Sequence, residues 1–180
     1  MESFIYENKC LSNSLCDKII EMFNSDNTQQ SKQFNNRLCI DFTIPEHDIW
    51  FEIKNTIINE LEINLQSFFS LLNKNNIVNQ NNKSIYKFYI EKSIKNKPLI
   101  KFEKHNNIDY YKKKRKLLRF YFCLNDIEDG GEIIFFNNRE IKSEKGKFIL
   151  FPIEWFFPYF VNTPLCYDKY TIFGDIYIDI

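Results

Sequence analysis

Alanine is absent from this sequence of 180 residues, and glycine, histidine and valine are scarce. With only four glycines and five prolines, the chain lacks the linkers that usually separate domains. No apolar run reaches the roughly 18–20 residues that a membrane span requires, and residues 1–5 lack the basic and apolar parts of a secretion signal. These absences predict one domain over residues 1–180, a cytoplasmic location and no membrane partner.

An excess of positive charge is also missing, because 24 Lys and Arg residues balance 24 Asp and Glu residues. The overall attraction to nucleic acid that a basic surface provides is therefore not expected. The two histidines, His47 and His105, lie far from any pair of cysteines, and no CxxC motif occurs among the five cysteines. A structural zinc site is consequently disfavoured, and reduced thiols are expected.

Apolar residues recur at helical spacing in two segments of the first half. The first covers Leu15–Phe23, and either Ser12 or Asn13 can cap it. The second runs from about Ile49 to Leu72. Around these helices we expect short strands at residues 4–6 and 37–44 and a polar loop at residues 24–36.

The second half has the alternating pattern of strands. Strands are expected at residues 85–91, 99–105, 117–124, 132–136, 141–145, 147–151 and 169–179. A hairpin turn at Asp129-Gly130-Gly131 is expected before the strand at residues 132–136, and a turn at Gly146 joins two others as a pair. Two or three helices followed by seven or eight strands predict an α+β fold, in which a helical support (residues 1–83) packs against a strand-rich core (residues 84–180).

An ordered series of short patterns runs through the second half. It comprises His105 at a strand end, Leu124-Asn125-Asp126, Gly130-Gly131-Glu132, the segment 145–152 (KGKFILFP) and Asp168-Lys169-Tyr170. This series resembles the iron(II)- and 2-oxoglutarate-dependent dioxygenases, specifically the prolyl 4-hydroxylase-like branch that is common in viral and bacterial genomes. The resemblance covers residues 84–180 well and residues 4–75 loosely. It implies a double-stranded β-helix, or jelly roll, with N-terminal helices packed on one sheet; for a viral protein, the expected location becomes the host cytoplasm.

The resemblance also implies where iron ligands would lie. Iron(II) with open positions favours two imidazoles and one carboxylate on one face of the metal. His105 falls at the first ligand position, but the family's carboxylate falls at Asn107, whose amide is a weak neutral ligand. Asp109 lies further on, roughly 13 Å from His105 on a regular strand at about 3.3 Å per residue. The second imidazole falls at Tyr159, whose phenol stays protonated at neutral pH. Only His105 matches among these four candidate metal ligands.

Other residues correspond to the cosubstrate and substrate sites of the family. Lys169 stands where the family places the cation that binds the far carboxylate of 2-oxoglutarate. Arg119 replaces a residue that is usually small, so its side chain is expected to enter the cavity. With Tyr110 and Tyr111, it would border the substrate groove. The basic run at residues 112–116 is either a solvated loop or a surface for an acidic peptide or nucleic acid.

Two main functions remain open at this stage. In the first, the protein is a dioxygenase that uses Fe(II) and 2-oxoglutarate to hydroxylate a peptide or protein, with proline as one target. In the second, the fold is kept without catalysis or cofactors, and the protein is a binding or interaction module. A third and weaker alternative, nucleic-acid binding through residues 110–116, is opposed by the zero net charge.

Overall fold

The computed structural model describes residues 4–26, 31–33, 37–41, 49–72, 83–98, 108–109, 113–136, 138–153 and 157–179. The helices are α1 (Asn13–Ser25) and α2 (Phe51–Leu72). The strands are β1 (Tyr6–Lys9), β2 (Ser31–Gln33), β3 (Arg37–Asp41), β4 (Lys83–Ser93), β5 (Ile108–Asp109), β6 (Lys114–Cys123), β7 (Ile133–Phe135), β8 (Glu140–Ile141), β9 (Lys147–Pro152), β10 (Tyr159–Val161) and β11 (Lys169–Asp179).

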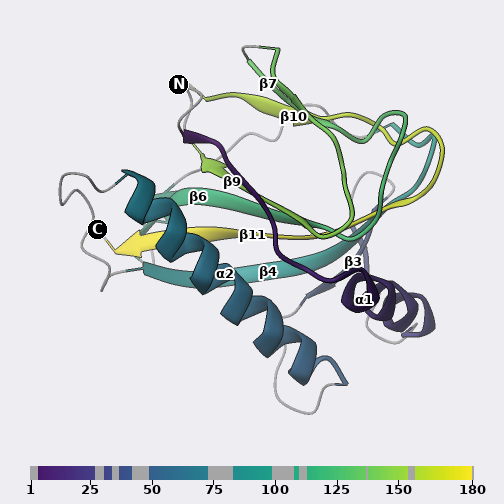
Figure 1. The fold of residues 1–180 in the computed structure, drawn as a ribbon, viewed down its shortest axis with the longest axis horizontal. Coiled ribbons are helices and arrows are strands. Elements are labelled where there is room, and N and C mark those ends of the chain that lie inside the picture. The colour runs from purple at the N-terminus through teal and green to yellow at the C-terminus, as the bar shows by residue number, and fades with distance from the viewer. Residues whose placement is uncertain are drawn as a thin grey trace.

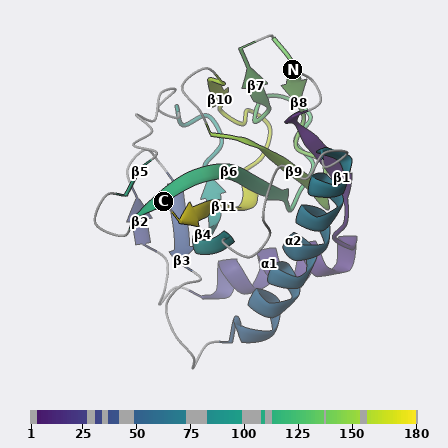
Figure 2. The ribbon, with the colours of Figure 1, turned by 90° about the vertical axis from the view of Figure 1, so that its left-hand side faces the viewer.

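The strands form two antiparallel sheets. The larger has the order β1-β9-β6-β11-β4-β3-β2, with β5 also paired to β6, and the smaller has the order β10-β7-β8. Figure 1 shows the small sheet above the large one, and both helices on the opposite side of the large sheet. Figure 2 shows the same three layers from the side. The expected α+β class is confirmed.

Helix α1 forms where its cap and its apolar spacing predict. The Ser12 hydroxyl accepts a hydrogen bond from the Leu15 amide, which satisfies one of the amides that a helix start leaves unpaired. Cys16, Ile19 and Phe23 then recur on the buried face. In α2, the buried Ile53, Ile57, Leu61 and Phe68 have the same spacing and pack in the same cluster. Neither helix in the described ranges has the length and apolarity needed to cross a bilayer.

Because successive residues of a strand point to opposite faces, the central strands β6, β9 and β11 of the large sheet contribute to two cores. Phe120 and Phe122 of β6 pack in the core beneath the helices. Tyr121 and Cys123 of the same strand pack in a second core with residues of the small sheet, such as Phe135. The large sheet is thus buried on both faces, and the second core lies between the sheets.

Three sequence-based expectations about connections are wrong. The loop expected at residues 24–36 contains strand β2, which pairs with β3. The strands around Gly146 do not pair with each other, since β8 pairs with β7 while β9 pairs with β1 and β6. The turn at Gly130-Gly131 forms no hairpin either, because β6 and β7 lie in different sheets. Local turn residues mark a change of direction but carry no information about which sheet receives the next strand.

Two further expectations are not tested. The strand expected at residues 99–105 lies outside the described residues, and the single-domain assignment stays a prediction.

Gly146 tests how closely the turn before β9 packs against the segment that precedes α1. Its φ is +81°, and its carbonyl accepts hydrogen bonds from the amides of Cys10 and Leu11. A Cβ atom there would lie 2.3 Å from the carbonyl oxygen of Leu11, so Gly146→Ala combines backbone strain with a clash. We expect it to lower the free energy of unfolding by about 2–4 kcal/mol in urea titrations. Lys145→Ala, which removes an exposed ion pair with Asp17, should have little effect. Equal losses in both variants would show that position 146 does not require glycine.

Candidate functional site

The candidate site lies between the two sheets, on the inner face of the large sheet. Side chains at alternate positions of β4, β6 and β11 point to this face. The relevant residues, called the inter-sheet site below, are Glu91, Ser93, Arg119, Lys169, Thr171 and Asp175 of the large sheet and Tyr159 of β10. Six are buried and Tyr159 is half-buried. Strand register places Asp175 opposite Arg119, Lys169 opposite Ser93, and Thr171 opposite Glu91.

A buried ion pair occupies one end of the inter-sheet site. Arg119 is only 5% exposed, and its Nε and Nη2 donate to the two carboxylate oxygens of Asp175 at 2.6 and 3.0 Å. Lys116 Nζ lies 2.9 Å from the same carboxylate. Burial alone would raise the pKa of Asp175, but Arg119 and Lys116 outweigh burial and hold the pKa below its ordinary value. Burial likewise opposes the charge of Arg119, while Tyr159 and Asp175 keep its pKa well above the usual value.

The third hydrogen bond of Arg119 crosses to the small sheet. Its Nη1 donates to the Tyr159 hydroxyl oxygen at 2.5 Å, and the guanidinium carbon lies 6.0 Å from the centroid of the Tyr159 ring. The resemblance placed the second iron-binding imidazole at Tyr159. An oxygen that already accepts a hydrogen bond from a guanidinium is a poor ligand for another cation, because the two positive charges would lie only a few ångströms apart. Tyr159 therefore does not fit the role of a neutral imidazole ligand.

The other candidate metal ligands are not placed. His105 and Asn107 lie outside the described residues, and for Asp109 only the backbone of β5, paired with β6, is described. Tyr110 and Tyr111, expected in the substrate groove, also lie outside. Within the described ranges, no group of three or more His, Cys, Asp and Glu side chains could hold a metal ion.

Lys169 lies at the other end of the inter-sheet site, at the start of β11. It is 3% exposed, and its Nζ donates to the Gly131 carbonyl at 2.5 Å. Gly131 has φ +71°, and a Cβ there would lie 3.3 Å from Cδ of Lys169, so glycine permits this close approach. The Gly130-Gly131 pair, which was expected to form a hairpin turn, instead brings a carbonyl to the lysine.

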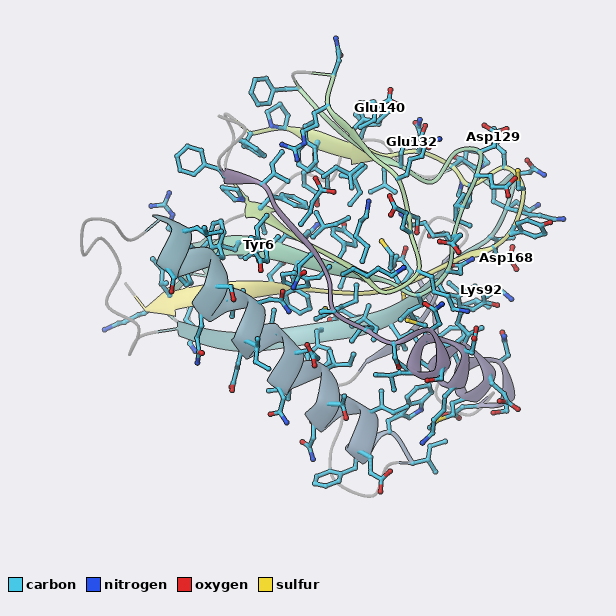
Figure 3. All side chains as sticks on the ribbon, in the orientation of Figure 1. Tyr6, Lys92, Asp129, Glu132, Glu140 and Asp168 are labelled. Carbon is cyan, nitrogen blue, oxygen red and sulfur yellow. The ribbon has the colours of Figure 1, made fainter. Side chains whose placement is uncertain are left out.

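Asn125 holds the backbone on both sides of Lys169. Its Nδ2 donates to the Asp168 carbonyl at 2.9 Å, and its Oδ1 accepts from the Tyr170 amide at 2.8 Å. The Asp168 carboxylate in turn pairs with Lys92 at 3.1 Å, and Figure 3 shows these two labelled side chains close together at this end of the sheets. The motifs at residues 124–126 and 168–170 are therefore joined in space, and together they position the lysine.

Sequence reasoning missed two buried carboxylates of this site. Glu91 is 6% exposed and accepts a hydrogen bond from the Ser93 hydroxyl at 2.8 Å. Glu91 follows Ile90 and Asp175 precedes Ile176, and both isoleucines belong to the helix-side core. A charged residue next to a core residue on a strand normally indicates a solvent-exposed polar face. Both side chains are nevertheless buried. The sequence signal for Asp175 was weak, because it is only a charge flanked by Gly174 and Ile176.

Between the charged ends, aromatic rings fill the inter-sheet core. Phe151 contacts Tyr121, Phe135 and Tyr159, with ring centroids 6.1, 5.0 and 4.7 Å apart. Tyr121 also stacks on Phe173 at 5.8 Å. These contacts join strands of both sheets, so the rings contribute to holding the sheets together.

Comparisons with solved structures identify the fold. The chain is similar to the viral collagen prolyl hydroxylase of Paramecium Bursaria Chlorella virus-1, in complex with 2OG, with a TM-score of 0.67 and 14% identity over 97% of this chain and 96% of that one. It is also similar to a prolyl-4-hydroxylase of Pseudomonas putida (TM-score 0.63, 11% identity, 98% and 93% coverage). A third similar structure is a prolyl hydroxylase of Trichoplax adhaerens bound to a peptide fragment of the hypoxia inducible factor oxygen degradation domain (TM-score 0.64, 16% identity, 98% and 84% coverage).

These likenesses show that the chain has the prolyl 4-hydroxylase fold, a double-stranded β-helix. The resemblance to this branch and the jelly-roll architecture are thereby confirmed at the level of fold. No family model matches the sequence, and the search of curated proteins gives no match. Function must consequently be argued from the inter-sheet site itself.

The depressed pKa of Asp175 predicts how stability depends on pH. Because the folded state lowers this pKa, the ion pair stabilises the protein fully at neutral pH, and this contribution declines as the pH falls below about 4. Asp175→Asn should lower the free energy of unfolding by about 3 kcal/mol at pH 7. The difference from the wild type should narrow by pH 3 in urea titrations.

Asp17→Asn is the matched control for this measurement, because the Asp17 carboxylate is largely exposed and pairs with Lys145. Its effect on stability should be close to zero at both pH values. A gap between the wild type and Asp175→Asn that stays constant from pH 7 to pH 3 would show that the Asp175 charge contributes nothing to stability.

Proposed function

We propose that the protein has the prolyl 4-hydroxylase fold with an incomplete iron site, and that it acts as a binding or interaction module without catalysis. The observation that carries this proposal is the hydrogen bond from Arg119 to Tyr159, at the position where the resemblance requires an imidazole. The sequence adds Asn107 where the same resemblance requires a carboxylate. Even the loss of groups that merely support metal ligands costs about 10–100-fold in affinity, so the loss of two ligands should abolish useful iron binding.

The Lys169 end of the site supports the same proposal. The lysine ammonium already donates to the Gly131 carbonyl, and the buried Glu91 carboxylate lies on the same face of the neighbouring strand. A cosubstrate such as 2-oxoglutarate carries two negative charges. A buried carboxylate near its cation would therefore oppose its binding.

The second candidate function is an active iron(II)- and 2-oxoglutarate-dependent dioxygenase. The observation that favours it is the burial of Lys169 at the position of the family's cosubstrate cation, held there by Asn125. In this alternative, His105 binds iron, with Asn107 or Asp109 and Tyr159 as the further ligands.

For either function, the proposed partner is a peptide or protein. One similar structure contains a peptide fragment, and the zero net charge disfavours nucleic acid. The basic run contributes less free charge than its sequence suggests, since Lys116 pairs with Asp175 and lies 5.9 Å from the Tyr177 ring centroid. A cytoplasmic location stays a prediction.

Iron binding and turnover separate the two functions. We expect anaerobic titration with Fe(II) to show no binding at micromolar concentrations, because two of the three ligands of the family are replaced. Aerobic incubation with Fe(II), 2-oxoglutarate, ascorbate and either poly(L-proline) or proline-containing peptides should release no succinate above a protein-free blank.

Tight iron binding together with succinate release would establish the dioxygenase instead. In that case Lys169→Met should abolish succinate release, whereas Lys142→Met, a change at an exposed lysine outside the site, should not. The proposed role as a peptide-binding module is tested by measuring the affinity of the protein for the same peptides by fluorescence anisotropy. No measurable affinity for any of them would remove the support for a peptide partner.

The role of Glu91 can be measured separately by calorimetric titration with 2-oxoglutarate. Removal of its negative charge by Glu91→Gln should raise the affinity for this dianion by about tenfold, on the Coulomb energy expected for two groups several ångströms apart at the intermediate dielectric of a protein site. Glu132→Gln is a suitable control, because Glu132 bonds Asn162 outside the inter-sheet site. An affinity that is unchanged in Glu91→Gln would show that this carboxylate does not oppose the cosubstrate.

A further inference from the structure

We infer that Arg119 is a built-in cation that joins the two sheets at the place where the resembled enzymes hold a metal ion, so that this protein keeps its architecture without one. One part of the inference rests on the proposed function, namely that Arg119 occupies the position of the metal ion. The contacts by which Arg119 joins the two sheets do not depend on that function.

The geometry of Arg119 is that of a cross-link. Its side chain arises from β6 in the centre of the large sheet and makes two hydrogen bonds to Asp175 on the neighbouring strand β11. Its third hydrogen bond reaches Tyr159 on β10 in the small sheet. The planar guanidinium presents its donors in a fixed fork, and one such group therefore ties three strands of two sheets to one point.

The charge of this point also resembles that of a metal centre. A divalent ion held by one carboxylate and neutral ligands has a net charge of +1. Arg119 and Lys116 contribute two positive charges and Asp175 contributes one negative charge, which again leaves +1 beside the phenol of Tyr159. A metal ion at this point would be repelled by the positive charge. In addition, the Tyr159 phenol and the Asp175 carboxylate already have partners.

Because Arg119 is buried, its guanidinium requires partners inside the protein. A guanidinium that is almost completely removed from water must be hydrogen-bonded and paired with an opposite charge. Arg119 lies in the run Leu118-Arg119-Phe120, where the flanking side chains belong to the helix-side core. Its partners must therefore come from the inter-sheet side, where Asp175 and Tyr159 accept its hydrogen bonds.

Thermal unfolding midpoints of full-length variants test the inference. Arg119→Met keeps the aliphatic length and removes the charge, and we expect the midpoint to fall by about 10 °C. Tyr159→Phe keeps the ring and removes only the acceptor, with an expected fall of about 4 °C. Arg139→Met is the control, since Arg139 also bonds a carboxylate, Glu7, but at the surface; its midpoint should change by less than about 2 °C.

The same measurement with metal completes the test. Mn(II), a redox-stable substitute for iron(II), at about 100 µM and EDTA at the same concentration should each shift the wild-type midpoint by less than about 1 °C, because a ligand stabilises a fold only when it binds the folded state. A rise of several degrees with Mn(II) would overturn the metal-independence. A midpoint of Arg119→Met equal to that of Arg139→Met would overturn the cross-link.

The outcomes remain informative if one variant fails. Should Arg119→Met give no folded protein, Tyr159→Phe decides: a fall of a few degrees supports the cross-link, and an unchanged midpoint overturns it. Failure of the proposed function is distinguishable, since succinate release by the wild type would refute the loss of catalysis even where the Arg119→Met midpoint falls as expected.

Discussion

A charged guanidinium inside a folded protein must be paired, and around Arg119 this requirement organises the space between the two sheets. Its partners Asp175 and Tyr159 come from a neighbouring strand and from the facing sheet. Breaking such a pair by removal of one partner costs about 3–5 kcal/mol, a large fraction of the stability of an ordinary domain. The position of β10 over the large sheet is thus coupled to one buried charge, and the aromatic contacts of Phe151 with both sheets reinforce it.

A shared fold and the chemistry of a site depend on different residues of a chain. The chain shares the prolyl 4-hydroxylase architecture at 11–16% identity, which is sufficient for two sheets and their supporting helices but specifies no reaction. At one end of the inter-sheet site, Lys169 is positioned by Asn125 as a binding cation would be. At the other end, the Arg119 guanidinium donates a hydrogen bond to Tyr159, the residue at which the resemblance to the dioxygenases places a metal ligand. Catalysis depends on such individual side chains, whereas the fold depends on the distributed apolar contacts around them.

The sequence-based reading was most reliable where one periodicity governs one segment. Helices α1 and α2 begin and end close to the expected residues, with Ser12 as the cap, and β11 covers the expected residues 169–179. The ordered motifs also led to the jelly roll, and two of them do lie together, because Asn125 bonds the backbone of Asp168 and Tyr170 on either side of Lys169. Strand partners were less predictable: Gly131 and Gly146 indicate that the chain turns, but whether the next strand joins the same sheet depends on packing distant in sequence. The metal-ligand candidates His105, Asn107 and Asp109 stay predictions.

Local pattern by itself determined the helices, most strands and the α+β class, because periodicity and capping act within a few residues of the chain. The inward position of Arg119 was expected from the family resemblance. Only the tertiary structure decided that Glu91 and Asp175 are buried, that Tyr159 accepts a hydrogen bond from a guanidinium, and that Gly131 brings a carbonyl to Lys169. The physical reason is that a strand has two faces and the sequence shows only that they differ. Whether the polar face meets water or a second sheet is settled by residues at a long sequence separation, which no local pattern encodes.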